Sequence, residues 1–295
     1  MTHSAKPPAR PRSASRSVPR LITWGSVGLV LVIVLALVIV GVTGSPGSTH
    51  GTGYQKAPQL LTKQLTSIPE SLYNAIGVTS PTVPVTAPTP TSGQPELEYP
   101  SRSGASLPGI FYFGGEYCPF CAAERWALIA ALSRFGGVRD LAMTTSSSTD
   151  VYPNTQTFSF YRASFDSEVV ALRAVEHYSN TPDPKTGWTI LENPTASQTA
   201  LLHRYDETSS GLDFPFISIG NQFLIQGSQY SPGVLQGLSR EQIAAGLKDP
   251  TNPVTQAIVS AANYVSASIC SVTKNQPGNV CGSPGVMAAA RAMEH

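Results

Sequence analysis

Residues 21–43 are a run of 23 residues without one charged side chain, in which Leu, Val and Ile predominate. A helix rises about 1.5 Å per residue, so a helix of this length reaches roughly 35 Å and can cross the hydrocarbon core of a bilayer. A secretory signal peptide has the same basic start but a shorter apolar run of about 7–15 residues. The small residues after position 40 leave cleavage open, but the length predicts one transmembrane helix.

Charge is distributed unevenly along the chain. Residues 1–20 carry five Lys or Arg and no acid, whereas the rest of the chain carries 14 basic and 18 acidic side chains. Basic residues before a transmembrane helix hold the N-terminus in the cytoplasm. We therefore expect a single-pass protein of the cell membrane whose C-terminal domain is extracytoplasmic. The negative balance after residue 20 argues against nucleic-acid binding, which needs a basic face.

Composition divides the chain into five segments. Apolar residues have helical spacing between positions 58 and 77, although Pro69 must interrupt or restart the helix. This pair of short helices could pack onto the main domain or form a stalk near the membrane. The expected segments are a disordered cytoplasmic tail (1–20), the transmembrane helix (21–43), an extracytoplasmic tether with a Pro/Thr-rich linker at 80–95 (44–95), a globular domain (96–250), and a C-terminal helix with a disulfide-closed loop (251–295).

The globular part has the pattern of an α/β domain. Short apolar and alternating runs predict strands, and longer amphipathic runs predict helices. The order of these elements favours a mixed sheet flanked by helices. The expected strands are 107–113, 155–165, 214–219 and 222–225, and the expected helices are 122–135, 168–178, 197–205 and 239–247. Gly220-Asn221 indicates a hairpin between the last two strands, and Ser239 with Gln242 resembles a capping box at the start of the last helix.

The sequence Cys118-Pro119-Phe120-Cys121 lies between an expected strand and an expected helix. A thiol at a helix N-terminus faces unpaired amide groups and the positive end of the helix dipole, both of which favour the thiolate. Pro119 suits the first helical turn because it has no N–H group to leave unpaired. Two intervening residues let Cys121 attack a mixed disulfide formed by Cys118. We therefore interpret the pair as a redox-active dithiol.

Other interpretations of the four cysteines stay open. The Cys118–Cys121 pair could be half of a zinc site or a structural disulfide. Cys270 and Cys281 enclose a polar loop after an Ala-rich helix, which favours a structural disulfide at the C-terminus. They could also form a second exchange pair that relays electrons to or from Cys121.

Two segments, GIFYFGGEYCPFCAAERW and DFPFISIGNQF, resemble the thioredoxin superfamily. In that superfamily a cis-proline before a strand lies beside the catalytic disulfide and contacts the substrate chain. The resemblance implies this role for Phe214-Pro215, with a cis peptide bond. More narrowly, the segment EYCPFCAAERWALIAALSRFG looks like the signature of an uncharacterised membrane-anchored family of thioredoxin-like proteins, known only as a domain of unknown function. This resemblance covers roughly residues 55–285.

The chain departs from thioredoxin in two respects. Thioredoxin has Trp-Cys-Gly-Pro-Cys, whereas Tyr117 precedes the motif here and Pro119-Phe120 fills it. About ninety residues separate Cys121 from Pro215, more than in a minimal thioredoxin. The excess at 144–155 and 180–195 could form a lid, a partner surface or plain loops.

Several side chains near the motif are candidates for supporting roles. Glu116 could accept or relay a proton, or it could be an exposed loop carboxylate. Glu124 and Arg125 follow Cys121 by three and four residues, which places them on or beside its helical face. Arg125 could favour the thiolate or form a structural ion pair. Tyr117 is expected to line the groove near the dithiol with Tyr112 and Phe113, although packing alone would explain the last two.

The leading prediction is a membrane-anchored thiol–disulfide oxidoreductase that needs no cofactor or metal. Cys118 is the expected nucleophile, Cys121 the resolving thiol, and Pro215 and Phe214 the substrate contacts. Expected partners are thiols or disulfides of secreted and membrane proteins, with a quinone-linked membrane oxidase or a thiol reductase to reset the pair. The alternatives are a thioredoxin-like binding module with a structural disulfide and a metal carrier or sensor that uses both thiolates.

Overall fold

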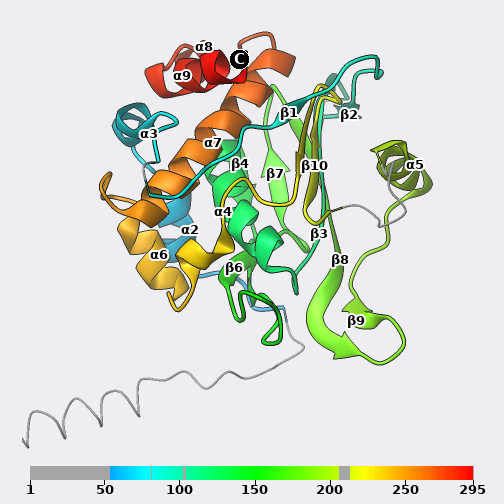
Figure 1. Ribbon diagram of the computed structural model, residues 1–295. Helices are drawn as coiled ribbons and strands as arrows, with labels where there is room; N and C mark the ends of the chain where they lie inside the picture. The colour runs from blue at the N-terminus through cyan, green and yellow to red at the C-terminus, as the bar shows by residue number, and fades with distance from the viewer. Residues whose placement is uncertain (1–53, 81, 102–103, 206–212, 295) are drawn as a thin grey trace, which may run out of the picture. The chain divides into compact units, whose positions relative to one another are not determined.

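Strand β3 (Ser106–Gly115) lies at the centre of the fold in the computed structural model, which describes residues 54–80, 82–101, 104–205 and 213–294. In this part of the chain, seven strands form one mixed sheet (Figure 1). β3 pairs in parallel with β8 (Ala171–Asp183) and antiparallel with β10 (Phe216–Ile219). The order β1-β11-β10-β3-β8-β9 is completed by β1 (Thr89–Pro90), β11 (Phe223–Gln226) and β9 (Gly187–Ile190), and β2 (Glu98–Pro100) pairs with β3.

Helices cover both faces of this sheet, as the sequence predicts. Successive side chains of a strand point to opposite faces, so Ile110 and Tyr112 join one apolar cluster, and Phe111 and Phe113 join another. The first cluster lies under α4 (Pro119–Leu132) and α7 (Pro253–Val272), and the second under α5 (Ala196–Tyr205), on the opposite side in Figure 1. Burial on both faces explains why β3 is an almost continuous apolar run.

The expected strand at 155–165 is wrong in its extent. Two strands occupy this region, β6 (Gln156–Ser159) and β7 (Ser164–Asp166), separated by a turn in which Arg162 has a φ of 63°. A residue with positive φ cannot continue an extended strand. Each strand pairs in its own two-stranded sheet, β6 with β5 (Ala142–Thr145) and β7 with β4 (Gly137–Arg139).

The expected helix at 168–178 is also wrong, because most of this segment belongs to β8. Its Ala, Leu, Arg and Glu residues favour a helix locally, but propensity is a weak prior that tertiary pairing overrides. Pairing with β3 on one side and β9 on the other supplies that context. The expected helix at 197–205 and the hairpin around Gly220 are confirmed by α5 and by β10 with β11.

The two short helices before the sheet pack onto the main domain, which decides against a free stalk. They are α2 (Gln59–Thr66) and α3 (Glu70–Ile76), and Pro69 is the residue at which the helix restarts. α2 contacts α4 and α6 (Arg240–Gly246), and α3 contacts α7 and α9 (Pro284–Met293). The linker that follows them adds β1 to the sheet edge at β11.

The C-terminal helices are joined to the core by one cation and one disulfide. Arg134, just after α4, forms an ion pair of 2.7 Å with Glu70 of α3 and donates hydrogen bonds to the side chains of Asn263, Ser266 and Ser283. Cys270 and Cys281 form the predicted disulfide between α7 and α8 (Gly278–Cys281). The capping box predicted at Ser239 is present at the start of α6, after the short 3-10 helix η1 (Pro232–Leu235).

Residues 53–295 form one compact unit. The expected cytoplasmic tail and transmembrane helix, residues 1–43, lie outside the residues that the structure describes. Among the residues that it does describe, none of the helices has the length and apolar character needed to span a bilayer.

Candidate functional site

Cys118 is the N-cap of α4, at the junction between β3 and the helix, as predicted. Its sulfur accepts a hydrogen bond from the backbone N–H of Cys121 over 3.3 Å, so it occupies the place that a Ser or Asp side chain takes at an ordinary N-cap. Pro119 fills the first helical position. The junction therefore holds the sulfur at the positive end of the helix dipole.

The two cysteines are free thiols with opposite electrostatic surroundings. The hydrogen bond from the Cys121 side chain lowers the pKa of Cys118, and the Cys121 backbone amide and Arg125 act in the same direction against burial. Burial raises the pKa of Cys121 well above its usual value. This difference favours the thiolate at Cys118 and the protonated form at Cys121, which suits an attacking and a resolving thiol.

The segment Phe214-Pro215, which the resemblance places beside the dithiol, lies against Cys118. The Phe214–Pro215 peptide bond is cis, as the resemblance implies, and the carbonyl oxygen of Phe214 is 3.7 Å from the Cys118 sulfur. Residues 96 positions apart in the sequence thus meet at one sulfur. Cys118 is 5% exposed and Cys121 is fully buried.

A buried ion pair lies behind the dithiol. Both side chains of Arg125 and Glu176 are fully buried, and their closest atoms are 2.7 Å apart. Arg125 also donates to the carbonyl oxygen of Gly115 over 2.8 Å, and Glu176 accepts from the amide of Phe160. Both roles expected for Arg125 therefore coexist, because it forms the structural ion pair and also lowers the pKa of Cys118.

Sequence reasoning missed Glu176, because it placed this residue on a helix. Its neighbour His177, which falls in the same expected helix at 168–178, is half-buried on β8 with its ring 5.5 Å from the ring of Phe113. The segment LRAVEHY carries no local signal of this role, because its Arg, Glu and His residues are equally compatible with a solvated helix.

The two other candidate carboxylates are less exposed than an ordinary surface acid. Glu116 accepts a hydrogen bond of 3.2 Å from Thr144, and burial raises its pKa. Glu116 is therefore not an exposed loop carboxylate, which was one of the two alternatives. Glu124 is fully buried and accepts from the backbone amide of Gln229 over 3.0 Å. Burial raises the pKa of Glu124 to about 8.

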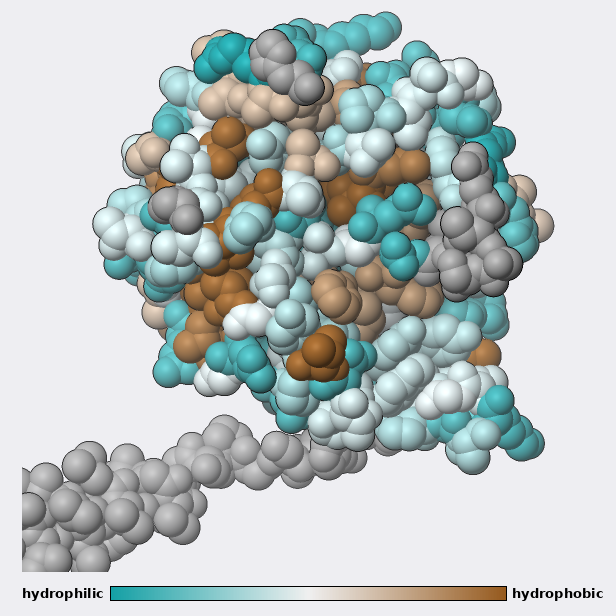
Figure 2. All heavy atoms as spheres, viewed as in Figure 1, coloured by the Kyte–Doolittle hydropathy of each residue, from teal (hydrophilic) through white to brown (hydrophobic). Residues whose placement is uncertain are grey.

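Aromatic rings border the dithiol on two sides. Tyr117 stacks on Trp188 of β9 with ring centroids 4.8 Å apart, and it meets the ring of Phe214 edge-on at 6.3 Å. On the other side, Phe120 meets Tyr152 edge-on at 6.0 Å and is 37% exposed. Figure 2 shows apolar side chains at the surface over the region in which Figure 1 places α4 and the loop before β6.

Both segments with excess length therefore border the site. The loop before β6 is attached to the motif by a hydrogen bond of 2.7 Å from the amide of Ser147 to the carbonyl of Tyr117. The hairpin of β8 and β9 carries Trp188 to the opposite side of Tyr117.

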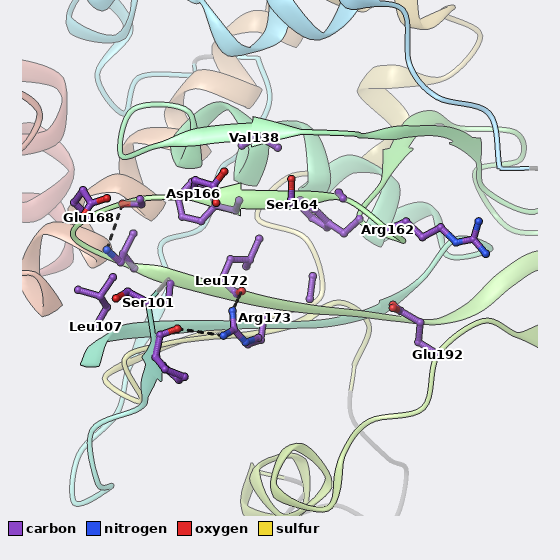
Figure 3. A pocket seen from close by; sticks show the side chains of 18 residues that line it. Ser101, Leu107, Val138, Arg162, Ser164, Asp166, Glu168, Leu172, Arg173 and Glu192 are labelled. Atoms are coloured by element: carbon purple, nitrogen blue, oxygen red, sulfur yellow. Dashed lines mark hydrogen bonds between the residues drawn. The ribbon is translucent and has the colours of Figure 1, made fainter. Parts of the chain in front are cut away.

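A cavity of about 560 Å³ lies elsewhere, between β7 and β8. Figure 3 shows Arg162 and Glu168 at its two ends and Arg173 donating to the carbonyl of Pro100. Its described lining contains charges of both signs and neither Cys118 nor Cys121. Within the described part of the chain, moreover, His, Cys, Asp and Glu side chains form no group of three or more that could hold a metal ion.

One protein-family model matches the chain, over residues 103–271, and its description is "Domain of unknown function" (DUF929). The match covers more than half of the 295 residues and includes the dithiol, Glu176 and Pro215. Comparison with curated proteins finds no match, and comparison with solved structures finds none either.

Proposed function

The chain belongs to the DUF929 family, and because that description assigns no activity, we propose a function from the site itself: a thiol–disulfide oxidoreductase of thioredoxin-like fold, with Cys118 as nucleophile. The observation that carries the proposal is the placement of the Cys118 sulfur, which lies at a helix N-terminus and 3.7 Å from the carbonyl oxygen of Phe214. The helix N-terminus favours the thiolate, and once Cys118 has lost its proton the Phe214 carbonyl, which accepts from the Cys118 thiol, can accept from a substrate chain instead.

The reaction is a two-step exchange. The Cys118 thiolate attacks one sulfur of a client disulfide, and the other client sulfur leaves as a thiolate. Cys121 then loses its proton and attacks the Cys118 sulfur, which forms the Cys118–Cys121 disulfide and releases the second client thiolate. The client gains two electrons and the dithiol loses two. Run in reverse, the same steps oxidise a client dithiol.

The membrane and partner assignments belong to the same proposal. Residues 21–43 would anchor the protein with its N-terminus in the cytoplasm, so that the dithiol faces secreted and membrane proteins. A quinone-linked membrane oxidase or a thiol reductase would reset the pair. The balance between oxidation and reduction depends on its reduction potential.

Trapping of mixed disulfides tests this function. In Cys121→Ala, Cys118 can attack a client but cannot be displaced by Cys121, so we expect disulfide-linked adducts on non-reducing gels. Cys118→Ala is the matched control, because it removes the nucleophile and keeps Cys121. Equal adduct yields in both variants, or none in either, would overturn the proposal.

The 5% exposure of Cys118 favours a second candidate, a binding module of the cell envelope in which the cysteines have a structural role. In that case the Cys118–Cys121 disulfide would resist reduction by a small dithiol, and a double alanine variant would still bind its partner. Rapid reduction together with loss of exchange in the double variant would support the oxidoreductase.

A further inference from the structure

The phenol of Tyr112 has no hydrogen-bond partner among the described residues, although its side chain is fully buried. A buried hydroxyl without a partner loses the free energy of a hydrogen bond, so such groups are rare in folded proteins. Removing the oxygen would leave the ring contacts of Tyr112 with Phe160 and Arg125 in place. Packing alone therefore explains the ring and leaves the hydroxyl unexplained.

The hydroxyl lies beside the sulfur of Cys121. Tyr112 and Gly114 point to the same face of β3, and the Tyr112 hydroxyl occupies the space where Gly114 would carry a Cβ. The Cys121 sulfur is 3.0 Å from that same point, and the hydroxyl is closer to it still. Both atoms lie within 3.0 Å of that point, so they are less than about 6 Å apart, and no side chain at position 114 lies between them.

A second unpartnered donor belongs to the same surroundings. Nη1 of Arg125 is buried and has no hydrogen-bond partner within the part of the chain that the structure describes. Arg125 follows Cys121 by four residues on α4, so both side chains lie on one face of the helix. Several charged and titratable groups surround the Cys121 sulfur. They are Cys118 and Tyr117 from the turn, Arg125 from its own helix and Tyr112 from β3, which also interacts with Glu176 of β8.

The exchange reaction creates a need for such donors at one step. In the dithiol, burial and the hydrogen bond between the two cysteine side chains both raise the pKa of Cys121 and so favour its protonated form. Once Cys118 is bonded to a client, Cys121 must become an anion in a fully buried position, where burial opposes the charge. A hydrogen bond to the charged form counteracts that effect.

We propose that Tyr112 is a catalytic residue of the resolving step, in which its hydroxyl donates to the Cys121 thiolate while Arg125 supplies a nearby positive charge. This inference rests on the proposed exchange function and adds a specific role to it. No proton is transferred from Tyr112, because the phenol stays protonated and only donates a hydrogen bond.

Reaction with Ellman's reagent separates the two steps in the reduced full-length chain in mild detergent. Cys118 attacks the reagent and releases one coloured nitrothiolate, and Cys121 then displaces the second. Cys121→Ala should show only the first phase, which assigns the first phase to Cys118 and the second to Cys121. In Tyr112→Phe we expect the first phase to be unchanged and the second phase to be slower. Each tenfold loss of Cys121 thiolate should slow the second phase by only about threefold, because a thiolate with a higher pKa is also a stronger nucleophile.

The pH dependence of the second phase distinguishes this role from a structural one. The rate of the second phase should begin to rise at a higher pH in Tyr112→Phe than in the native chain, because the Cys121 thiolate has lost a hydrogen-bond donor. The matched control is Tyr230→Phe, which removes another buried hydroxyl that bonds to α4, at the carbonyl of Ala123 over 2.6 Å. We expect the control to keep the second phase of the native chain.

If Tyr112→Phe fails to fold, 3-fluorotyrosine placed at position 112 alone keeps the shape and makes the phenol a stronger donor. The second phase should then rise at lower pH. An unchanged profile in either folded variant would overturn the inference. Because this assay uses only the chain's own thiols, a failure to trap client proteins would overturn the exchange function and leave the Tyr112 result intact.

Discussion

The guanidinium of Arg125 and the carboxylate of Glu176 are 2.7 Å apart, and neither side chain is exposed to solvent. The pair joins α4, which begins at the dithiol, to the strand that pairs with β3. Breaking a buried pair leaves an uncompensated charge in a low-dielectric interior, which is far more costly than losing a surface pair.

We therefore expect Arg125→Met to lower the free energy of unfolding by about 3–5 kcal/mol in urea titrations. The double variant Arg125→Met/Glu176→Leu should recover much of this loss, because it removes both charges. A double variant that loses the sum of the two single effects would show that the residues act independently.

The lowered pKa of Cys118 leads to a second prediction. Alkylation of Cys118 by iodoacetamide, followed by mass spectrometry, should rise at a lower pH than for an ordinary exposed thiol. In Cys121→Ala the rise should move to higher pH, because the side-chain donor is absent while the helix N-terminus is retained. An identical pH profile in both proteins would assign the effect to the helix alone.

Glu124 should make stability depend on pH. Its pKa is about 8 in the folded chain against an ordinary value of 4.5, so the folded state binds more protons than the unfolded state between these limits. Stability from this group is therefore complete below about pH 4.5 and is lost as the pH rises through 8. Glu124→Gln should remove this dependence.

The native chain should lose unfolding free energy relative to Glu124→Gln between pH 5 and pH 9. We expect this loss to be on the order of 3–5 kcal/mol. Both proteins would be unfolded in urea at each pH. A constant difference would mean that Glu124 is ionised in the folded chain.

The Cys270–Cys281 disulfide closes a loop with a sequence separation of 11. Replacing both cysteines by alanine should lower the free energy of unfolding by about 2–3 kcal/mol, because the unfolded chain regains loop entropy. Both phases with Ellman's reagent should stay as in the native chain if the disulfide is structural. Loss of the second phase in a folded variant would instead support the relay to Cys121.

The elements that the sequence predicts best are those whose signals are local. The dithiol at the strand–helix junction, the capping box at Ser239 and the restart at Pro69 depend on residues within one or two turns. β8 was missed because its residues favour a helix and only its distant partners make it a strand. For the same reason the pairing of Arg125 with Glu176, and the stacking of Trp188 on Tyr117, could not be predicted.

The contacts of Arg134 bear on where a recombinant fragment of this protein can begin and end. The family match ends at residue 271 and begins at residue 103, yet Arg134 is paired with Glu70 before that range and with Ser283 after it. A fragment restricted to the matched range would leave the largely buried Arg134 without Glu70 and Ser283, and it would expose the apolar sides of α4 and α7 to solvent. The range that family comparison recognises is thus smaller than the compact unit to which these contacts belong, and recombinant boundaries belong before α2 and after α9.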